Sequence, residues 1–552
     1  MKESLFAEVP VQFQRTRNVG RNIVFGLINR CVSLLLPFIV RTILIYRFGA
    51  LYLGMNSLLA SIFQVLNLAE LGFGSAVVYS LYKPVAEGDM NTVCAYLGTY
   101  RKIYRIIGLV ILGLGLVVLP WFPLLVKDIR VPDNMNLYAW YFIFLANAVV
   151  SYLLYGYKTS IPSALQRQDI LSEIDTIILV CKSVVQVACL LLTDNFYFYL
   201  LTSLLFTLLR NLVISCVVDR RFPQYVCRGD ISEEQFRELK LLVGGLALSK
   251  FRGASRHAID SICITAFVSL TMTAVYSNYF LIHSAVVSMS GILCGAMVAS
   301  VGNTIAVENR EKNYRDMRRF NFIYMLLAGW AMICLLCLYQ PFVRLWMSGA
   351  LPSDTGNAGV ALALGGIAAG EPLMLGMPEV VALCLYFYLL KAGDMRWIYH
   401  QGAGLWWKAR YIVIAEIVCN VVLNILLARY WGVLGIILAT LISLFFINFI
   451  GGAWILFKEY FQNGKLHEFF ADQARLFLVT VAVGVVCFYV CEMVAVGASI
   501  SHKGVESLYL LIRLVICTIV TILLYYLVYH RSAQYRDAKD WLWKRYRAMR
   551  ER

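Results

Sequence analysis

Charged side chains stand inside long apolar segments of this sequence, where a bilayer makes each of them costly. An ionisable group in the hydrocarbon core costs about 2.5–3.5 kcal/mol on insertion scales, so such residues usually mark substrate or ion pathways. Three acids lie deep in the apolar segments: Glu70, Asp260 and Glu416. Eight cations share that position: Arg30, Arg41, Lys182, Arg210, Lys250, Arg252, Arg256 and Arg513. Internal ion pairing alone would give nearly equal numbers, so the excess of cations predicts a site for an anion.

Spacing and depth separate these cations into groups. Arg30 and Arg41 are eleven residues apart, which returns to within ~20° around a helix and stacks both on one face. Lys182 stands near the middle of its segment, too deep for its ammonium to reach the interface easily. Arg41, Arg210 and Arg513 lie near segment ends, where a long side chain can instead extend to the headgroups. We therefore expect Arg30 and Lys182 to be functional.

Two further rows of polar residues follow helical spacing. One consists of Arg252, Arg256 and Asp260, and the other of Glu416, Asn420 and Asn424. Arg256 and Asp260 are four residues apart, which equally suits a structural ion pair on one helix. Glu416 with its two asparagines equally suits hydrogen bonding between helices. Both rows therefore keep a structural interpretation beside the functional one.

The predicted site has three parts. The contacts to an anionic headgroup are Arg30, Arg41, Lys182, Lys250, Arg252 and Arg256. Candidates for coupling to H⁺ or Na⁺ are Glu70, Asp260 and Glu416. The remaining polar lining is Asn67, Gln186, Asn278, Asn420 and Asn424.

Signatures of catalysis are missing from the sequence. It has no metal-ligand spacing, no Gly-x-Ser-x-Gly and no Walker motif, and its six His are scattered. The fifteen Cys stand singly in apolar segments, apart from a C-x-x-C at Cys334 and Cys337 that has no evident partners. Packing in the core is the favoured interpretation of these thiols over redox or metal chemistry. We predict a protein that is not an enzyme and has no metal site or cofactor, driven by an ion gradient, the membrane potential or the substrate gradient.

The composition of the chain indicates that the protein folds in a lipid bilayer. The chain is 60% hydrophobic and 15% charged, with a mean hydropathy of +0.70, whereas about a quarter of the residues in a soluble domain are charged. Within lipid every backbone polar group must be paired internally, and continuous apolar runs of ~20 residues indicate helices rather than strands. Fourteen spans are predicted: 22–45, 53–81, 104–126, 136–157, 170–192, 196–218, 244–267, 271–303, 320–343, 377–399, 408–428, 432–457, 474–496 and 507–530.

The distribution of basic residues gives these spans an orientation. Lys and Arg concentrate in cytoplasmic loops of membrane proteins. With a cytoplasmic N-terminus, most of the 49 Lys and Arg fall on that side. The opposite side receives only Arg47, Lys127, Arg130, Arg344, Arg429 and Lys503. Both termini are therefore predicted to be cytoplasmic, and topology explains the net charge of +16 without nucleic acid. The basic, Trp-containing tail is predicted to form a helix on the inner leaflet.

A comparison of the chain with itself reveals an internal repeat. At a shift of 221 residues, Gly74 falls on Gly295, Glu87 on Glu308 and Pro120 on Pro341. The shift grows to about 237 after the 344–376 loop, which an insertion there explains. Each repeat holds six spans, an even number, so the two lobes share an orientation and form parallel repeats. The predicted organisation is a cytoplasmic tail (1–21), an N-lobe (22–230), a C-lobe (231–457) and a segment with two further spans and a basic tail (458–552).

Several stretches of the sequence resemble a known family. They are the run from Arg41 to Glu87, Tyr276–Tyr279, Ala299–Asn303 before Glu308, Pro341-Phe342 with Leu345-Trp346, and the segment around Glu416 with the Trp431-Gly432 turn. Together they resemble the polysaccharide-type flippases of the multidrug/oligosaccharidyl-lipid/polysaccharide (MOP) exporter superfamily. The resemblance covers nearly the whole chain. In the seventh span it carries over only Lys250 and Asp260, because the neighbouring residues depart from the family pattern.

The resemblance implies an all-α integral membrane fold, MATE-like, of two six-helix lobes around a central cavity with two C-terminal helices. It implies movement of an undecaprenyl-pyrophosphate-linked oligosaccharide from the inner to the outer leaflet of the bacterial cytoplasmic membrane by alternating access, for O-antigen, capsule or exopolysaccharide synthesis. The first and seventh spans are expected to form the gate. Expected partners are membrane lipids, a polysaccharide polymerase and chain-length proteins.

Three alternatives stay open at the level of sequence. A multidrug or cation antiporter of the same superfamily would need an acidic cavity, which this sequence lacks. A lipid II flippase has the same fourteen-helix plan and an equally anionic headgroup. A polysaccharide polymerase or ligase would need a large external catalytic loop, whereas the loop at 351–376 has almost no reactive side chains; a re-entrant or interfacial segment fits it better.

Overall fold

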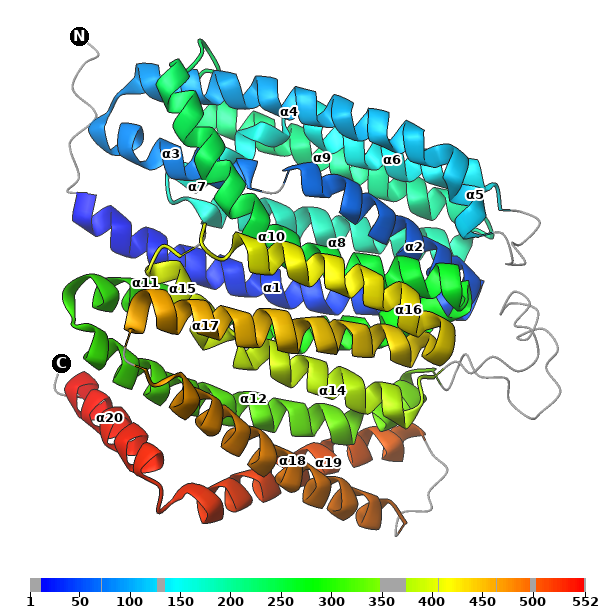
Figure 1. Ribbon diagram of the computed structural model, residues 1–552. Helices are drawn as coiled ribbons and strands as arrows, with labels where there is room; N and C mark the ends of the chain where they lie inside the picture. The colour runs from blue at the N-terminus through cyan, green and yellow to red at the C-terminus, as the bar shows by residue number, and fades with distance from the viewer. Residues whose placement is uncertain are drawn as a thin grey trace. The chain divides into compact units, whose positions relative to one another are not determined.

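The computed structural model describes residues 11–70, 72–126, 135–347, 374–405, 407–462, 464–496 and 503–550 (Figure 1). Within these ranges every regular element is a helix. The described chain divides into two compact units, the first ending at Ala258 and the second beginning at Ile259. The boundary falls inside one long helix, α10 (Glu233–Phe267). Most of the 351–376 loop, and with it the prediction of a re-entrant segment, lies outside the described residues.

The first unit contains the predicted spans one to six and the start of the seventh. Its elements before α10 are α1 (Val11–Phe48), α2 (Ala50–Leu66), η1 (Asn67–Glu70), α3 (Phe73–Glu87), α4 (Met90–Val118), η2 (Leu119–Trp121), α5 (Phe122–Leu125), α6 (Leu137–Leu153), η3 (Gly156–Thr159), α7 (Ser160–Ala164), α8 (Gln168–Leu192) and α9 (Phe196–Arg221).

The second unit contains the remaining spans. After α10 its elements are α11 (Leu270–Val307), α12 (Arg310–Met347), α14 (Met377–Ala392), α15 (Asp394–Gly402), α16 (Arg410–Ile442), η4 (Ser443–Gly451), α17 (Gly452–Leu456), η5 (Phe457–Phe461), α18 (Leu466–Val496), α19 (Lys503–Tyr529) and α20 (Ala533–Arg550).

Every predicted span lies on helical structure, and the all-α membrane fold is confirmed. Among the described residues, eight helical segments are long and apolar enough to cross a membrane. The number rises to nine if Leu137–Leu153 and Gly156–Ala164, which are bent by 57° relative to each other, are counted together as one span. Arg410–Phe461 counts as one such segment although it holds two predicted spans. Its chain reverses at Gly432 (φ 54°, ψ −129°). Asn420 then donates a hydrogen bond to Thr440 over 3.0 Å, whereas twenty residues along a straight helix would separate them by ~30 Å.

Contacts between helices test the alternation of direction. α1 and α8 are the first and fifth spans and lie side by side (Figure 1). Asn29–Thr176 and Arg47–Asp194 both join residues 147 apart in sequence. A constant offset means that the two helices run parallel, as two odd-numbered spans must. In the second unit Gln473 of α18 contacts Asn321 of α12 at an offset of 152, and Arg318 contacts Asp472 at 154. The ninth and thirteenth spans are therefore parallel too.

The second predicted span and the span that the predicted repeat aligns with it differ at one position. The second span is interrupted at η1 and Gly72, whereas its counterpart α11 is continuous over Leu270–Val307. Gly72 has φ +100° and touches α10 so closely that a Cβ would lie 2.6 Å from the backbone N of Ala247. The position 221 residues later falls inside α11, which continues through it without a break. The break thus belongs to the first unit alone.

Gly72→Ala is expected to destabilise the protein by about 2–4 kcal/mol, because a left-handed residue is strained and its methyl group meets α10 backbone. Thermal unfolding in detergent measures the loss. Gly113→Ala is the matched control, since Gly113 lies in α4 with nothing within 4 Å of an added Cβ, and should unfold at or above the wild-type temperature. Equal unfolding temperatures for both variants would show that the break at Gly72 is not required.

Candidate functional site

Three of the predicted cations lie on the parallel helix pair α1–α8. Arg30 is exposed, and Arg41 and Lys182 are half-buried. The constant offset of 147 places Lys182 level with position 35 of α1, between Arg30 and Arg41. Arg30 and Arg41 are separated by ~16 Å along the helix axis. The pair therefore carries three positive charges within the length of a membrane span.

The ends and the middle of this pair differ in their electrostatics. Near one end Arg21 pairs with Asp169 at 3.1 Å, and at the other Arg47 pairs with Asp194 at 2.8 Å. Among the described residues no acid pairs with Arg30 or with Lys182, and Lys182 lies close to the midpoint of Gln168–Leu192. A mid-span ammonium without a counter-charge needs water and an anion near it. The α1–α8 pair is therefore the strongest candidate for contact with an anionic ligand.

The other cations have different surroundings. Arg256 is 6% exposed, and the side chains of Lys250 and Arg252 lie outside the described residues. Arg210 forms an ion pair with Asp175 at 2.6 Å, and Arg513 pairs with Glu492 at 3.0 Å. These two arginines are held by acids that the sequence count omitted. The surplus of positive charge is correspondingly smaller than the sequence indicates. Among the described side chains, the predicted cations without an acidic partner are Arg30 on α1 and Lys182 on α8.

Glu70 is held by tyrosines within the first unit. Its carboxylate accepts a hydrogen bond from Tyr104 of α4 and another, 2.7 Å long, from Tyr152 of α6. The Tyr100 ring packs against that of Tyr104, with centroids 4.6 Å apart. In the sequence, Tyr100 and Tyr104 are one helical turn apart. This spacing could have indicated that the two tyrosines contact each other. We call Glu70, Tyr100, Tyr104 and Tyr152 the tyrosine cage.

A cavity of about 630 Å³ adjoins the tyrosine cage. Besides Glu70, Tyr100 and Tyr104 its lining includes Gly72, Gly74, Ser75, Val78, Tyr79, Tyr82, Thr159, Ser160 and Ser163. Hydroxyl groups and aromatic rings surround a single carboxylate, a combination that suits a polyol or a bound proton or sodium ion. Asn67 lies on the same short helix as Glu70, and its buried side-chain oxygen lacks a hydrogen-bond partner in the described structure.

Asp260 lies in a buried polar network of the second unit. It accepts hydrogen bonds from Asn424 (2.9 Å), Thr440 (3.2 Å) and Tyr276 (3.4 Å), and Asn420 donates to the same Thr440. The segment Arg410–Phe461 folds back on itself at Gly432, and we call it the α16 hairpin. Asn424 on its first arm contacts Asp260 directly, and Asn420 does so through Thr440 on the second arm. Sequence reasoning missed Thr440 and Tyr276, because both come from helices whose packing the spacing does not reveal.

Glu416 is balanced by a cation through an amide bridge. Asn448 donates to Glu416 over 2.6 Å, and its oxygen accepts from Arg396 over 2.6 Å. Glu416 is 1% exposed and Arg396 4% exposed. A Cβ at Gly452 would fall on the Arg396 guanidinium, so a glycine there makes room for the cation. Arg396 was not among the cations singled out from the sequence, because it lies near the end of the predicted span 377–399.

The two remaining predicted polar residues have local partners. Gln186 donates to Ser203 of α9 over 3.0 Å, which joins α8 to the helix that follows it. Asn278 is buried and its side-chain amide donates to the sulfur of Met347 over 4.0 Å. The structure therefore places many of the predicted residues in three groups, which are the cations on α1–α8, the tyrosine cage, and the networks of Asp260 and Glu416. Gln186 and Asn278 belong to none of these groups.

Neither a protein-family model nor a curated protein sequence matches this chain, but solved structures share its fold. An inward closed conformation of the lipid II flippase MurJ superposes with a TM-score of 0.59 at 12% identity, covering 92% of this chain and 99% of that one. An inward-facing multidrug resistance MATE family transporter of the MOP superfamily gives 0.56 at 15%, covering 78% and 97%. A variant of the Vibrio cholerae MATE transporter VcmN gives 0.54 at 14%, covering 82% and 99%. The chain thus has the fold of MOP-superfamily flippases and transporters.

Proposed function

We propose that this protein is a flippase that moves a polyprenyl-pyrophosphate-linked oligosaccharide from the inner to the outer leaflet of a bacterial cytoplasmic membrane by alternating access. The observation that carries the proposal is Lys182, a mid-span ammonium without an acidic partner among the described residues, at a level between Arg30 and Arg41. A pyrophosphate carries several negative charges on a short group. Cations spread over ~16 Å can hold it at successive depths.

The sign of the charge argues against export of cationic drugs. A cation binds where acids are in excess, whereas Arg30 and Lys182 of the α1–α8 pair have no acidic partner among the described residues. Glu416 is balanced by Arg396 through Asn448, which leaves it unavailable as a drug-binding acid. An anionic, lipid-linked substrate fits this distribution better.

The tyrosine cage and its cavity supply the other half of the proposal. Hydroxyls and aromatic faces are the groups that bind sugars, and Glu70 can accept a proton as well as hydrogen bonds. We assign glycan contact to the cavity of about 630 Å³ and coupling to H⁺ or Na⁺ to Glu70, with Asp260 as the second coupling candidate. A polymerase and chain-length proteins are the proposed partners on the outer side.

A lipid II flippase is the second candidate function. The observation that favours it is the coverage of 92% of this chain by the MurJ structure, against 78% by the MATE structure. The two functions share a diphosphate headgroup and differ in the glycan. Only a substrate comparison separates them.

Reconstitution tests the proposal directly. The purified chain in proteoliposomes is given three fluorescent substrates: a polyprenyl-diphosphate oligosaccharide, lipid II and a cationic dye. We expect flipping of the first, detected as loss of protection from an external quencher, and none of the dye. Flipping of lipid II alone would establish the second candidate, and transport of the dye alone would overturn both.

A further inference from the structure

Three cysteine side chains from three membrane-spanning helices converge in the second unit. They are Cys337 of α12, Cys491 of α18 and Cys517 of α19, all buried, and their sulfurs lie within 4.8 Å of one another. The Cys491 and Cys517 sulfurs are 3.4 Å apart. We call these residues the thiol cluster. The sequence-based expectation that Cys337 lacks partners is wrong, because its partners lie more than a hundred residues further along the chain.

The separation of the sulfurs suits a shared metal ion. Metal–thiolate bonds of about 2.3 Å place the sulfurs of a trigonal or tetrahedral site roughly 3.8–4.0 Å apart. The sulfurs of the thiol cluster need to shift by only part of an ångström from their present positions to reach that spacing. Helices that already pack against one another supply all three, so little chain entropy is lost on binding.

The donor set selects the kind of metal. The cluster contains sulfur only, with no His or carboxylate among its members. Thiolates favour soft ions such as Cu(I), whereas Mg²⁺, Ca²⁺ and Mn²⁺ prefer oxygen. A structural Zn²⁺ site requires four ligands, and the cluster offers three. Three sulfurs alone therefore fit a monovalent soft ion.

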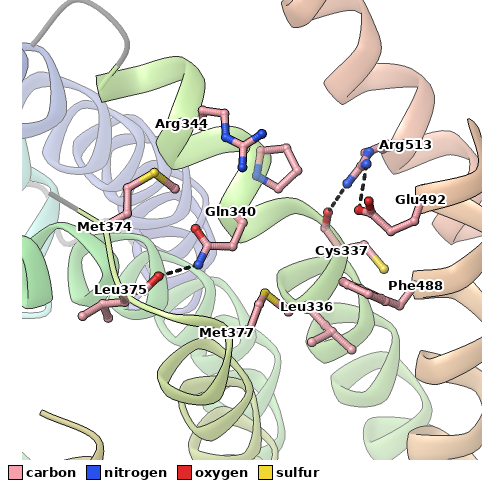
Figure 2. Close-up of a pocket in the computed structure, with 11 residues that line it drawn as sticks. Leu336, Cys337, Gln340, Arg344, Met374, Leu375, Met377, Phe488, Glu492 and Arg513 are labelled. Atoms are coloured by element: carbon pink, nitrogen blue, oxygen red, sulfur yellow. Dashed lines mark hydrogen bonds and ion pairs between the residues drawn. The ribbon is translucent and has the colours of Figure 1, made fainter. Parts of the chain in front are cut away.

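A buried arginine lies beside the thiol cluster and supplies positive charge. Arg513 donates a hydrogen bond to the Cys337 carbonyl oxygen over 3.2 Å and another to Glu492 over 3.0 Å, as Figure 2 shows. Its side chain is 4% exposed. A Cu(I) ion with three thiolates has a net charge of −2. Arg513 also pairs with Glu492, but that carboxylate is 48% exposed and is screened by its surroundings, so the buried guanidinium still reduces the cost of the charge.

A pocket gives the ion a route to the cluster. It has a volume of about 420 Å³ and is lined by Cys337, Arg513 and Glu492, with Gln340 and Arg344 on its other side (Figure 2). Cys337 thus connects the buried thiol cluster to a pocket with polar lining. An ion that enters this pocket has only the Cys337 residue to pass before it reaches the cluster.

We propose that Cys337, Cys491 and Cys517 bind one soft monovalent metal ion of the Cu(I) type, and that the ion fastens α18 and α19 to α12. Binding forms metal–sulfur bonds and releases the thiol protons to water, with no change of oxidation state. The inference uses only residues of the second unit and does not depend on the proposed flippase activity.

Titration of the purified, reduced full chain with Cu(I) under anaerobic conditions tests the site, with a colorimetric Cu(I) chelator as competitor. We expect one Cu(I) to be retained per chain and at least a 100-fold loss of affinity in the triple variant Cys337→Ser, Cys491→Ser, Cys517→Ser. Cys384→Ser is the matched control, since Cys384 is a buried thiol of α14 outside the cluster, and should bind as the wild type does. Equal retention by the triple variant would overturn the proposal.

A second measurement covers the case in which the triple variant does not fold. In the wild-type protein, Cu(I) should protect Cys337, Cys491 and Cys517 from alkylation, mapped by mass spectrometry, while alkylation of Cys384 stays unchanged. X-ray absorption should show only sulfur ligands at about 2.3 Å. Unprotected cluster thiols, or a disulfide between Cys491 and Cys517 formed without retained metal, would contradict the site.

Discussion

Lys182→Gln is expected to reduce flipping of a polyprenyl-diphosphate substrate by about 30-fold or more in proteoliposomes, while membrane insertion and thermal stability stay at the wild-type level. Truncating one partner of a buried, hydrogen-bonded charge pair costs about 2–5 kcal/mol. Here the partner is the substrate, so the loss appears in transport. Stability should not fall, because no acid among the described residues is left unpaired when the ammonium is removed.

Two further variants sharpen this expectation. Lys182→Arg keeps the charge and should retain a substantial part of the activity. Lys83→Gln removes an exposed ammonium, 3.9 Å from Glu87, from the same unit and should transport normally. Full activity of Lys182→Gln would show that the anionic headgroup does not bind at α1–α8. The proposed function would then lose its main support.

Arg396→Leu is expected to destabilise the second unit by about 3–5 kcal/mol, because it leaves the Glu416 carboxylate buried without its cation. The relay from Arg396 through Asn448 to Glu416 consists of two hydrogen bonds of 2.6 Å each. Thermal unfolding in detergent measures the effect. Arg531→Leu, which removes an exposed cation of the same unit, should change stability by less than about 0.5 kcal/mol.

A double variant distinguishes charge balance from simple packing. Adding Glu416→Gln to Arg396→Leu removes the stranded negative charge and should restore much of the lost stability. Additive losses in the double variant would mean that the two residues stabilise the fold independently. The relay would then be an incidental contact.

The helical layout was predictable because it depends on local properties. The length of apolar runs places the spans, and the alternation of loop charge requires parallel odd-numbered spans, which α1 with α8 and α12 with α18 confirm. The turn at Trp431-Gly432 was visible in sequence and is the reversal of the α16 hairpin. The break at Gly72 was harder to predict from the sequence. It depends on close contact with the backbone of α10, which is far along the chain.

Side-chain partners between distant helices were not predictable. Lys182 could be singled out because depth in a span is a local property, but Arg396 could not be matched to Glu416 without the packing of α15 against the α16 hairpin. The same reason hid the thiol cluster, whose members come from three helices. The number of polar groups in the membrane could be predicted from the composition. Which of them pair with one another could be determined only from the fold.

The α16 hairpin has a consequence for how the chain enters the bilayer during synthesis. Its first arm carries Glu416 and Asn420, and its second arm carries the groups that contact them, Asn448 and Thr440. Each arm alone would bring costly polar groups into lipid. Because the partners are joined by one turn at Gly432, the two arms can leave the translocation machinery together with those groups already hydrogen-bonded. Arg396 and Asp260 precede both arms in the chain, so the last contacts to form can do so inside the membrane.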